Sequence, residues 1–444
     1  MKFGIFFATM LLALPAGASS LAPTPPMGWN SWDAYGFTID EAQYRASAQV
    51  LAGLKSYGWN YAVIDEGWYL KNPDGRPGEF QFTLDANGRL IPDAARFPSA
   101  SNGAGFKPLA DWVHGLGLKF GIHIVRGIPR EVVQRNLPVA GSQFHAVDVA
   151  DTADTCPWNA DNYGVRDTPA GQAYYDSMMS LYAKWGLDFL KVDCIADHPY
   201  KADEIRMIAS AIGKSGRGIV LSLSPGPTNL THAAEVAKYS QMWRIADDIW
   251  DGWAFPGQTF PNGLRSAFDN LAKWARYARP GNWPDADMLP WGSLTPHPGW
   301  GKPRRSRLTE DEERTQFTLW AMARSPLILG ANVTKLDEFT RSLLTNKDAI
   351  AVNQTTTASE EIASTPEEAA RMRVWTASIG GHIAYVAVFN LQETPLRSEL
   401  PWPSALSGSR QAVFDIWKRQ TVAATDRMQV DLPAHACALF RIER

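Results

Sequence analysis

The sequence lacks the features of several functional classes. Lys and Arg number 43 against 46 Asp and Glu, so the formal charge of -3 favours neither nucleic acid nor an anionic membrane as a partner. The three cysteines, Cys156, Cys194 and Cys437, form no CxxC pair and no His/Cys cluster with metal-ligand spacing. A phosphate-binding GxxxxGK[ST] loop is also missing. These absences favour a neutral partner, and we expect no metal and no cofactor.

Long apolar runs are also absent after the N-terminus: no later stretch reaches the ~20 apolar residues that a membrane-spanning helix needs. The N-terminus combines Lys2, an apolar run from Phe3 to Leu14 and the small residues 16–18, which is typical of a signal peptide over residues 1–18. We therefore expect an exported protein, secreted or periplasmic, that leaves the membrane after cleavage. In an oxidising compartment, three cysteines predict one disulfide and one spare thiol.

Tryptophan is abundant, with 18 residues among 444. Trp rings stack on sugars, but they also fill cores, so the composition leaves both roles open.

Short β-forming runs alternate with helical patterns down to about residue 350. Helical periodicity is found, for example, over Glu41–Tyr57, Gly171–Trp185 and Asp311–Ala323. The expected strands are Met27–Trp32, Tyr61–Trp68, Lys119–Ile124, Asp188–Cys194, Ile219–Ser224, Gln241–Asp247, Trp283–Leu289 and Pro326–Gly330. Eight β-then-α units predict a parallel (β/α)8 TIM barrel over residues 22–355, rather than a doubly wound sheet.

The pattern changes at Gln354–Ala369, whose Thr, Ser and Glu residues are typical of a linker or an exposed edge. Strands without intervening helices follow, at Met372–Ser378, His382–Asn390, Gln411–Ile416 and Ala438–Ile442. We interpret residues 360–444 as a C-terminal antiparallel β-sandwich.

Carboxylates cluster where the barrel strands end, which is where (β/α)8 enzymes place their reacting groups. Asp65 and Glu66 end the second strand, Asp193 the fourth, Asp247 and Asp248 the sixth, and Asp285 and Asp287 the seventh. Such a set of carboxylates, together with tryptophan, suits general acid/base chemistry on a neutral polyol. Glycoside hydrolysis is the leading hypothesis, because it needs one carboxyl to protonate the leaving oxygen and another to attack or stabilise the reacting carbon.

Asp193 and Asp248 are the predicted catalytic pair. Lys191 lies two residues before Asp193 on the same strand face, and its charge favours the ionised carboxylate that a nucleophile requires. Asp248 follows Arg244 by four residues at a strand end. A helix N-cap or a surface salt bridge is the alternative role for Asp248, and Asp247 is a rival for the acid role.

Five spaced motifs carry a resemblance to a known family. They are Pro25–Trp32, Ile64–Trp68, Trp185–Asp193, Trp243-Arg244 with Asp248, and Pro284–Leu289. In these stretches, which run in family order over residues 22–355, the chain closely resembles glycoside hydrolase family 27, the α-galactosidase family.

The resemblance implies a barrel followed by a β-sandwich and a retaining mechanism, with Asp193 matching the nucleophile and Asp248 the acid/base. It also implies a sugar-binding set of Trp32, Asp65, Lys191, Arg244 and Asp287. The family disulfide maps to Cys156–Cys194, although the second cysteine commonly lies one residue later.

Three departures from the family pattern bear on the substrate: Glu66 replaces an Asp, His123 replaces a Tyr, and Ser224 stands where many α-galactosidases carry Glu. The longer Glu66 side chain reaches toward the position of the C6 hydroxymethyl of galactose, a group that L-arabinopyranose lacks. The change from Asp to Glu66 is thus similar to the branch of the family that prefers β-L-arabinopyranosides. The alternative role for Glu66 is a salt bridge at the rim of the pocket. The small Ser224 resembles members that accept a 2-acetamido group, as in α-N-acetylgalactosaminidases.

We therefore expect an exported retaining exo-glycosidase whose partner is a carbohydrate, a galactoside or an arabinopyranoside. A catalytically silent sugar-binding protein is disfavoured because both carboxylates are present. A phosphate-handling barrel is disfavoured because Asp287 and Gly330 are not accompanied by a Gly-rich loop. The leaving group and the oligomeric state, a homo-oligomer included, stay open.

Overall fold

The computed structural model describes residues 21–294, 302–406, 412–422 and 425–443. The signal peptide expected over residues 1–18 lies outside this range. No helix in the described residues is long and apolar enough to cross a membrane.

Eight parallel strands form the central sheet, in the order β10-β9-β8-β7-β3-β2-β1-β13. Just beyond β10, Leu289 pairs in parallel with Leu329 of β13, so the two ends of the sheet meet and the sheet closes. The strands are β1 (Met27–Asn30), β2 (Tyr61–Ile64), β3 (Lys119–Val125), β7 (Phe189–Asp193), β8 (Val220–Leu223), β9 (Met242–Arg244), β10 (Trp283–Asp285) and β13 (Leu327–Leu329). The (β/α)8 barrel and all eight of its predicted strands are thus confirmed.

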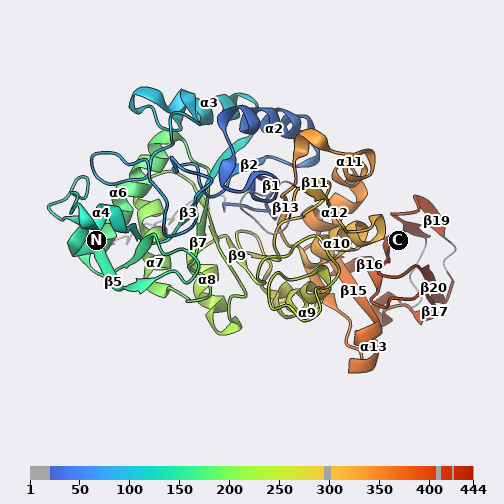
Figure 1. Ribbon diagram of the computed structural model, residues 1–444. Coiled ribbons are helices and arrows are strands. Elements are labelled where there is room, and N and C mark those ends of the chain that lie inside the picture. The colour runs from blue at the N-terminus through green and yellow to red at the C-terminus, as the bar shows by residue number, and fades with distance from the viewer. Residues whose placement is uncertain (1–20, 295–301, 407–411, 423–424, 444) are drawn as a thin grey trace, which may run out of the picture.

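Helices cover the outside of the barrel (Figure 1). The main ones are α2 (Glu41–Leu54), α3 (Lys107–Gly115), α6 (Pro169–Trp185), α7 (Ala202–Ser215), α8 (Ala233–Tyr239), α9 (Leu264–Trp274), α10 (Glu310–Ala323), α11 (Glu338–Leu344) and α12 (Lys347–Thr355). Local sequence fixes several ends: Asp40 and Gln43 form a capping box at the start of α2, and Gly186, with φ 89°, ends α6.

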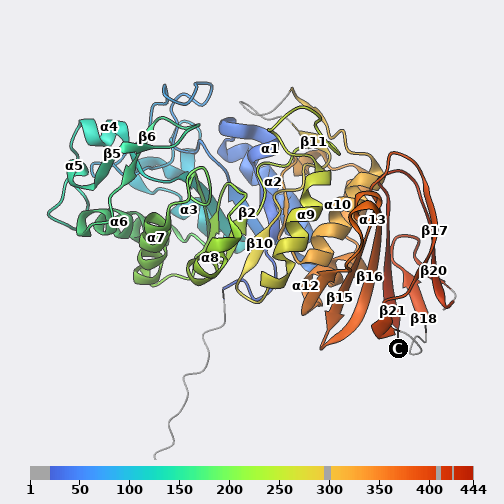
Figure 2. The same ribbon diagram turned by 90° about the horizontal axis from the view of Figure 1, so that it is seen from below.

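An insertion between β3 and β7 was not predicted. It contains α4 (Arg130–Gln134), α5 (Ala146–Val149) and a three-stranded antiparallel sheet of β4 (Ile128–Pro129), β6 (Asn162–Val165) and β5 (Ala150–Thr155). Figure 2 shows it at the end of the molecule opposite the C-terminal sheets. The Cys156–Cys194 disulfide, which is the pairing implied by the family resemblance, joins this insertion to the residue after β7.

The C-terminal part is an antiparallel β-sandwich, as predicted. Its larger sheet has the order β14 (Ala358–Glu361), β15 (Met372–Ile379), β16 (His382–Asn390), β21 (Cys437–Glu443), β18 (Ala412–Asp415) and β19 (Gln420–Val422), and its smaller sheet pairs β17 (Leu396–Pro401) with β20 (Arg427–Leu432). Four strands were missed: β14, β17, β19 and β20. In β20 exposed and buried residues alternate, which is the pattern of a half-buried strand, so this signal was present in the sequence but was not recognised.

Of the two interpretations of Gln354–Ala369, the exposed edge agrees with the structure and the linker does not. The segment contains the end of α12, the edge strand β14 and the start of α13 (Pro366–Arg371). The predicted strand Gln411–Ile416 corresponds to β18, and its first residue lies outside the described range.

Most of the tryptophans belong to the core. Trp29, Trp68, Trp243 and Trp320 are fully buried, and one continuous core extends from the barrel through α10 to Trp375 in β15. Among the tryptophans that the structure describes, Trp158 alone is exposed. The abundance of tryptophan is therefore mainly a packing feature.

Candidate active site

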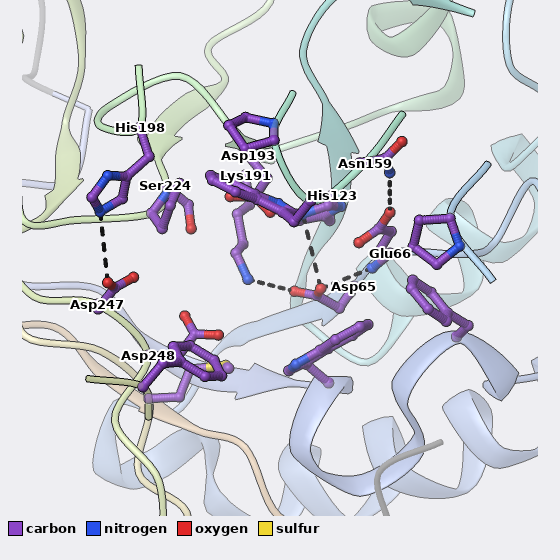
Figure 3. Close-up of a pocket in the computed structure, with 18 residues that line it drawn as sticks. Asp65, Glu66, His123, Asn159, Lys191, Asp193, His198, Ser224, Asp247 and Asp248 are labelled. Atoms are coloured by element: carbon purple, nitrogen blue, oxygen red, sulfur yellow. Dashed lines mark hydrogen bonds and ion pairs between the residues drawn. The ribbon is translucent and has the colours of Figure 1, made fainter. Parts of the chain in front are cut away.

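A cavity of about 670 Å³ opens where the barrel strands end (Figure 3). Nine of the residues singled out in the sequence line it: Trp32, Asp65, Glu66, His123, Lys191, Asp193, Ser224, Asp247 and Asp248. Two others, Arg244 and Asp287, line a small adjoining pocket that shares Lys191 and Ser224 with the main cavity. The fold thus brings all the predicted polar groups together from six strand ends.

Asp65, which is buried, and Lys191, which is half-buried, form an ion pair between the ends of β2 and β7. Lys191 Nζ donates to Asp65 Oδ2 at 2.9 Å, and Asn30 Nδ2 donates to the same oxygen at 2.6 Å. Burial favours the neutral carboxyl, but the charges of Lys191 and His123 outweigh it and hold the pKa of Asp65 far below its usual range. The carboxylate and the ammonium are therefore both charged at neutral pH.

Asp193 lies at the end of β7 beside His123 from β3. The distance from His123 Nε2 to Asp193 Oδ2 is 3.9 Å, and the backbone N–H of Cys194 donates to Asp193 Oδ1 at 2.8 Å. Burial alone would favour the neutral acid, but His123 first and then Lys191 outweigh it and lower the pKa of Asp193. This carboxyl is therefore ionised when a substrate arrives.

Asp248 lies beyond β9, and Figure 3 shows it on the side of the cavity opposite Asp193. Arg244 Nη2 lies 3.3 Å from Asp248 Oδ1 and 2.8 Å from Asp287 Oδ2. The Asp287 backbone has φ 92° and is fixed by two hydrogen bonds: its N–H donates to Asp285, and its carbonyl accepts from Trp320. Arg244 thus pairs with both carboxyls and connects Asp248 to Asp287, whose backbone is held in place.

Glu66 is buried in the cavity wall next to Asp65. Asn159 Nδ2, from the insertion, donates to Glu66 Oε1 at 3.1 Å. Burial raises the pKa of Glu66 to about 7, and the nearby charges of Asp193 and Asp65 contribute. Within the described part of the chain Glu66 has no ion-pair partner, and its side chain lines the cavity.

Several lining residues were missed by sequence reasoning: Phe37, Pro77, Pro157, Trp158, Asn159, His198, Pro225, Phe260 and Met288. His198 Nε2 lies 3.6 Å from Asp247 Oδ2, so Asp247 faces an imidazole at the cavity mouth. Asn159 could have been found from its position, because it follows Cys156 by three residues and the disulfide places that cysteine next to Asp193.

Donor atoms of Glu66, His123 and Asp193 lie within 4.8 Å of one another, which is close enough for a metal ion. Chemically, however, the cavity offers an ionised carboxylate, a second accessible carboxyl and a set of charged hydrogen-bonding groups. These suit acid/base and nucleophilic chemistry on a neutral, hydroxyl-rich ligand.

Comparisons with known proteins agree with this chemistry. Residues 24–163 and 159–355 match the family described as "Alpha galactosidase A", and residues 369–442 match the "Alpha galactosidase C-terminal beta sandwich domain". The structure of a family 27 β-L-arabinopyranosidase from Geobacillus stearothermophilus is 40% identical, with a TM-score of 0.90 and coverage of 96% of this chain and 97% of that chain.

Two further relatives have other substrates in their names. The structure of a proposed α-N-acetylgalactosaminidase from Bacillus halodurans is 38% identical, with a TM-score of 0.81 and coverage of 96% of this chain and 100% of that one. Alpha-galactosidase A from Cellvibrio japonicus is 28% identical over 467 residues, which cover 98% of this chain and 96% of the relative. The chain therefore belongs to glycoside hydrolase family 27, the α-galactosidase family, and is a glycoside hydrolase.

Proposed function

We propose that the protein is a retaining exo-glycosidase that removes terminal α-D-galactosyl residues, the stereochemically equivalent β-L-arabinopyranosyl residues, or both. The observation that carries the proposal is that Asp193, held ionised by its neighbours, and Asp248 open into the same cavity. An ionised carboxylate and a second carboxyl on opposite sides of a sugar site are the minimum that double displacement requires.

In the first step, the Asp193 carboxylate attacks the anomeric carbon while the bond to the leaving oxygen breaks. The Asp248 carboxyl gives its proton to that oxygen. In the second step, Asp248 takes a proton from water, and the water oxygen attacks the same carbon and releases Asp193. His123 and Lys191 stabilise Asp193 as an anion before attack and after release.

Five side chains are proposed to hold the sugar. The charged pair of Asp65 and Lys191 lies deep in the cavity, where it can accept from and donate to ring hydroxyls. Arg244 and Asp287 form the floor next to Asp248. Trp32, whose ring lies 5.0 Å from that of Phe37, forms a wall suited to the apolar face of a pyranose.

Glu66 favours the arabinopyranoside. Its carboxyl is buried in the cavity and hydrogen-bonded to Asn159, which keeps the side chain inside the pocket. A carboxyl in this place competes with the C6 hydroxymethyl of galactose, and L-arabinopyranose has no such group. The similarity to a β-L-arabinopyranosidase supports the same preference. Ser224 and the B. halodurans relative support a second candidate, an α-N-acetylgalactosaminide.

We further propose that the protein is exported and loses residues 1–18. The Cys156–Cys194 disulfide supports an oxidising destination, because such bonds persist outside the cytosol.

A panel of nitrophenyl glycosides tests the function: α-D-galactoside, β-L-arabinopyranoside and α-N-acetylgalactosaminide. We expect the highest kcat/KM on the arabinopyranoside, and NMR of the first product should show the anomer of the substrate. Activity confined to the acetamido sugar would replace the first candidate by the second. A product of opposite anomeric configuration would refute retention.

A further inference from the structure

Exposed aromatic side chains gather at the mouth of the cavity. Among the described residues, five large apolar side chains are exposed: Leu21, Val147, Trp158, Phe260 and Ile379. Trp158 and Phe260 are 39% and 47% exposed, and both line the cavity that contains Asp193 and Asp248. Single exposed apolar residues are ordinary on a protein surface, but two aromatic rings around one cavity indicate a binding surface.

Trp158 is anchored to the side of the cavity that carries Asp193. Trp158 lies two residues after Cys156, and Cys156 forms a disulfide with Cys194, the residue that follows Asp193. The next residue, Asn159, is buried and donates to Glu66. The backbone of Trp158 is therefore held on both sides while its ring stays exposed.

Phe260 is anchored to the side that carries Asp248. Both belong to the loop between β9 and α9, and this loop folds back on itself, because the Asn262 N–H donates to the Asp248 carbonyl at 2.8 Å. Asn262 also forms a bridge with Ile249. Phe260 is thus two residues from a direct backbone contact with the proposed acid/base.

The position of the leaving group follows from the chemistry of the proposed function, on which this inference rests. Asp248 must reach the glycosidic oxygen, so whatever is attached to that oxygen extends from Asp248 toward the mouth. Of the charged groups that suit the sugar, Asp65 is buried in the interior and Lys191, its partner, is half-buried beside it. The exposed rings of Trp158 and Phe260 lie outside this sugar-binding set and can contact the leaving group.

We propose that Trp158 and Phe260 form a leaving-group subsite that binds a ring with an apolar face, either an aryl group or a second pyranose. Aromatic rings contact both through stacking and C–H contacts. His198 and Asp247 line the same mouth and provide polar partners for hydroxyls on such a ring.

Substrates with and without a ring in the leaving group test the subsite. Trp158→Ala, Phe260→Ala and the double variant are compared with wild type on three substrates of the same sugar: the glycosyl fluoride, the nitrophenyl glycoside and a disaccharide. We expect each substitution to lower kcat/KM for the ring-bearing substrates by about 2- to 10-fold, with larger losses in the double variant. The fluoride kcat/KM and the inhibition constant of the free monosaccharide should stay unchanged.

Controls separate binding from folding. Val147→Ala and Ile379→Ala remove exposed apolar side chains that do not line the cavity, and they should leave all three substrates unaffected. Trp158→Phe keeps a ring and should retain most of the activity on ring-bearing substrates. Loss on the nitrophenyl glycoside alone would identify an aryl partner, and loss on the disaccharide alone a sugar.

Two results would overturn the subsite. One is an equal loss on fluoride and ring-bearing substrates, which would make the two aromatic residues part of the sugar site or of the scaffold. The other is no loss on any ring-bearing substrate. If wild type hydrolyses no glycosyl fluoride of galactose, arabinopyranose or N-acetylgalactosamine, the proposed function itself fails.

Discussion

Replacing Glu66 by Asp tests how the cavity selects its sugar. The substitution shortens a buried side chain by one methylene, moves the carboxyl away from the cavity centre and breaks the 3.1 Å contact with Asn159. Because Glu66 is 7% exposed, the space gained lies within the cavity wall and not in solvent. Asp193 and Asp248 keep their places on β7 and beyond β9.

The expected size of the change in selectivity follows from the C6 hydroxymethyl of galactose, which the space gained in Glu66→Asp would admit. Admitting or excluding one hydroxymethyl in a closed pocket is worth roughly 1–3 kcal/mol, which corresponds to about 10- to 200-fold in kcat/KM. We therefore expect the ratio of arabinopyranosidase to galactosidase activity to fall by about this factor in Glu66→Asp. The assay is kcat/KM on the two nitrophenyl glycosides, measured in the same preparation.

Asn159→Ala is the matched control. It keeps the full length of Glu66 but removes its hydrogen-bond donor, so the ratio should shift in the same direction by a smaller factor. In the Glu66→Asp background, Asn159→Ala should add little, since the contact is already lost. If Glu66→Asp lowers both activities by the same factor, Glu66 only supports the cavity wall, and the specificity argument is wrong.

Three further predictions concern the carboxyl groups. Asp193→Ala should abolish turnover, and azide should restore part of it with a product of inverted configuration, which NMR detects; azide rescue with retention would refute the nucleophile role. Asp248→Ala should lower kcat/KM far more for substrates with poor leaving groups than for the glycosyl fluoride, because fluoride departs without a proton. Equal losses of kcat/KM across these substrates would exclude Asp248 as the acid. The pKa of Glu66 is about 7 in the folded protein, against an ordinary value of 4.5. Between these two pH values the folded protein keeps a proton on Glu66 that the unfolded chain has released. The stability of the wild type should therefore fall by up to roughly 3 kcal/mol relative to Glu66→Gln as pH rises from 4.5 to about 7, because only the wild type loses this proton; parallel pH curves of the two proteins in denaturant unfolding would contradict the shift.

The barrel could be predicted because its signals are local and repeated. Each strand is a short β-forming run, and buried parallel strands tolerate few polar residues before their ends. Four predicted strands ran two or more residues too far: β1 ends at Asn30, β2 at Ile64, β9 at Arg244 and β10 at Asp285, earlier than the sequence pattern indicated. The carboxyl groups beyond these ends belong to loops that face the cavity, where the pattern of the strand no longer applies.

The residues contributed by irregular segments could not be predicted in the same way. Trp158 and Asn159 lie in the insertion between β3 and β7, and Phe260 lies in the long β9–α9 loop. Their positions depend on long-range constraints, the Cys156–Cys194 disulfide and the backbone contact to Asp248, which have no periodic signature. The sandwich strand β20 is a different case, because it carries the alternating pattern of a half-buried strand and could have been predicted.

Trapping the glycosyl-enzyme tests the central claim most directly. A 2-deoxy-2-fluoro glycosyl fluoride of the preferred sugar is the probe: its C2 fluorine slows both steps of a retaining enzyme, and its fluoride leaving group speeds the first, so the covalent intermediate accumulates. Peptide mass spectrometry should then find the sugar attached to Asp193, in wild type and in Asp248→Ala supplied with the fluoride donor. An adduct on Asp248 or Glu66, or no adduct together with an inverted product, would contradict the assignment of Asp193 as the nucleophile.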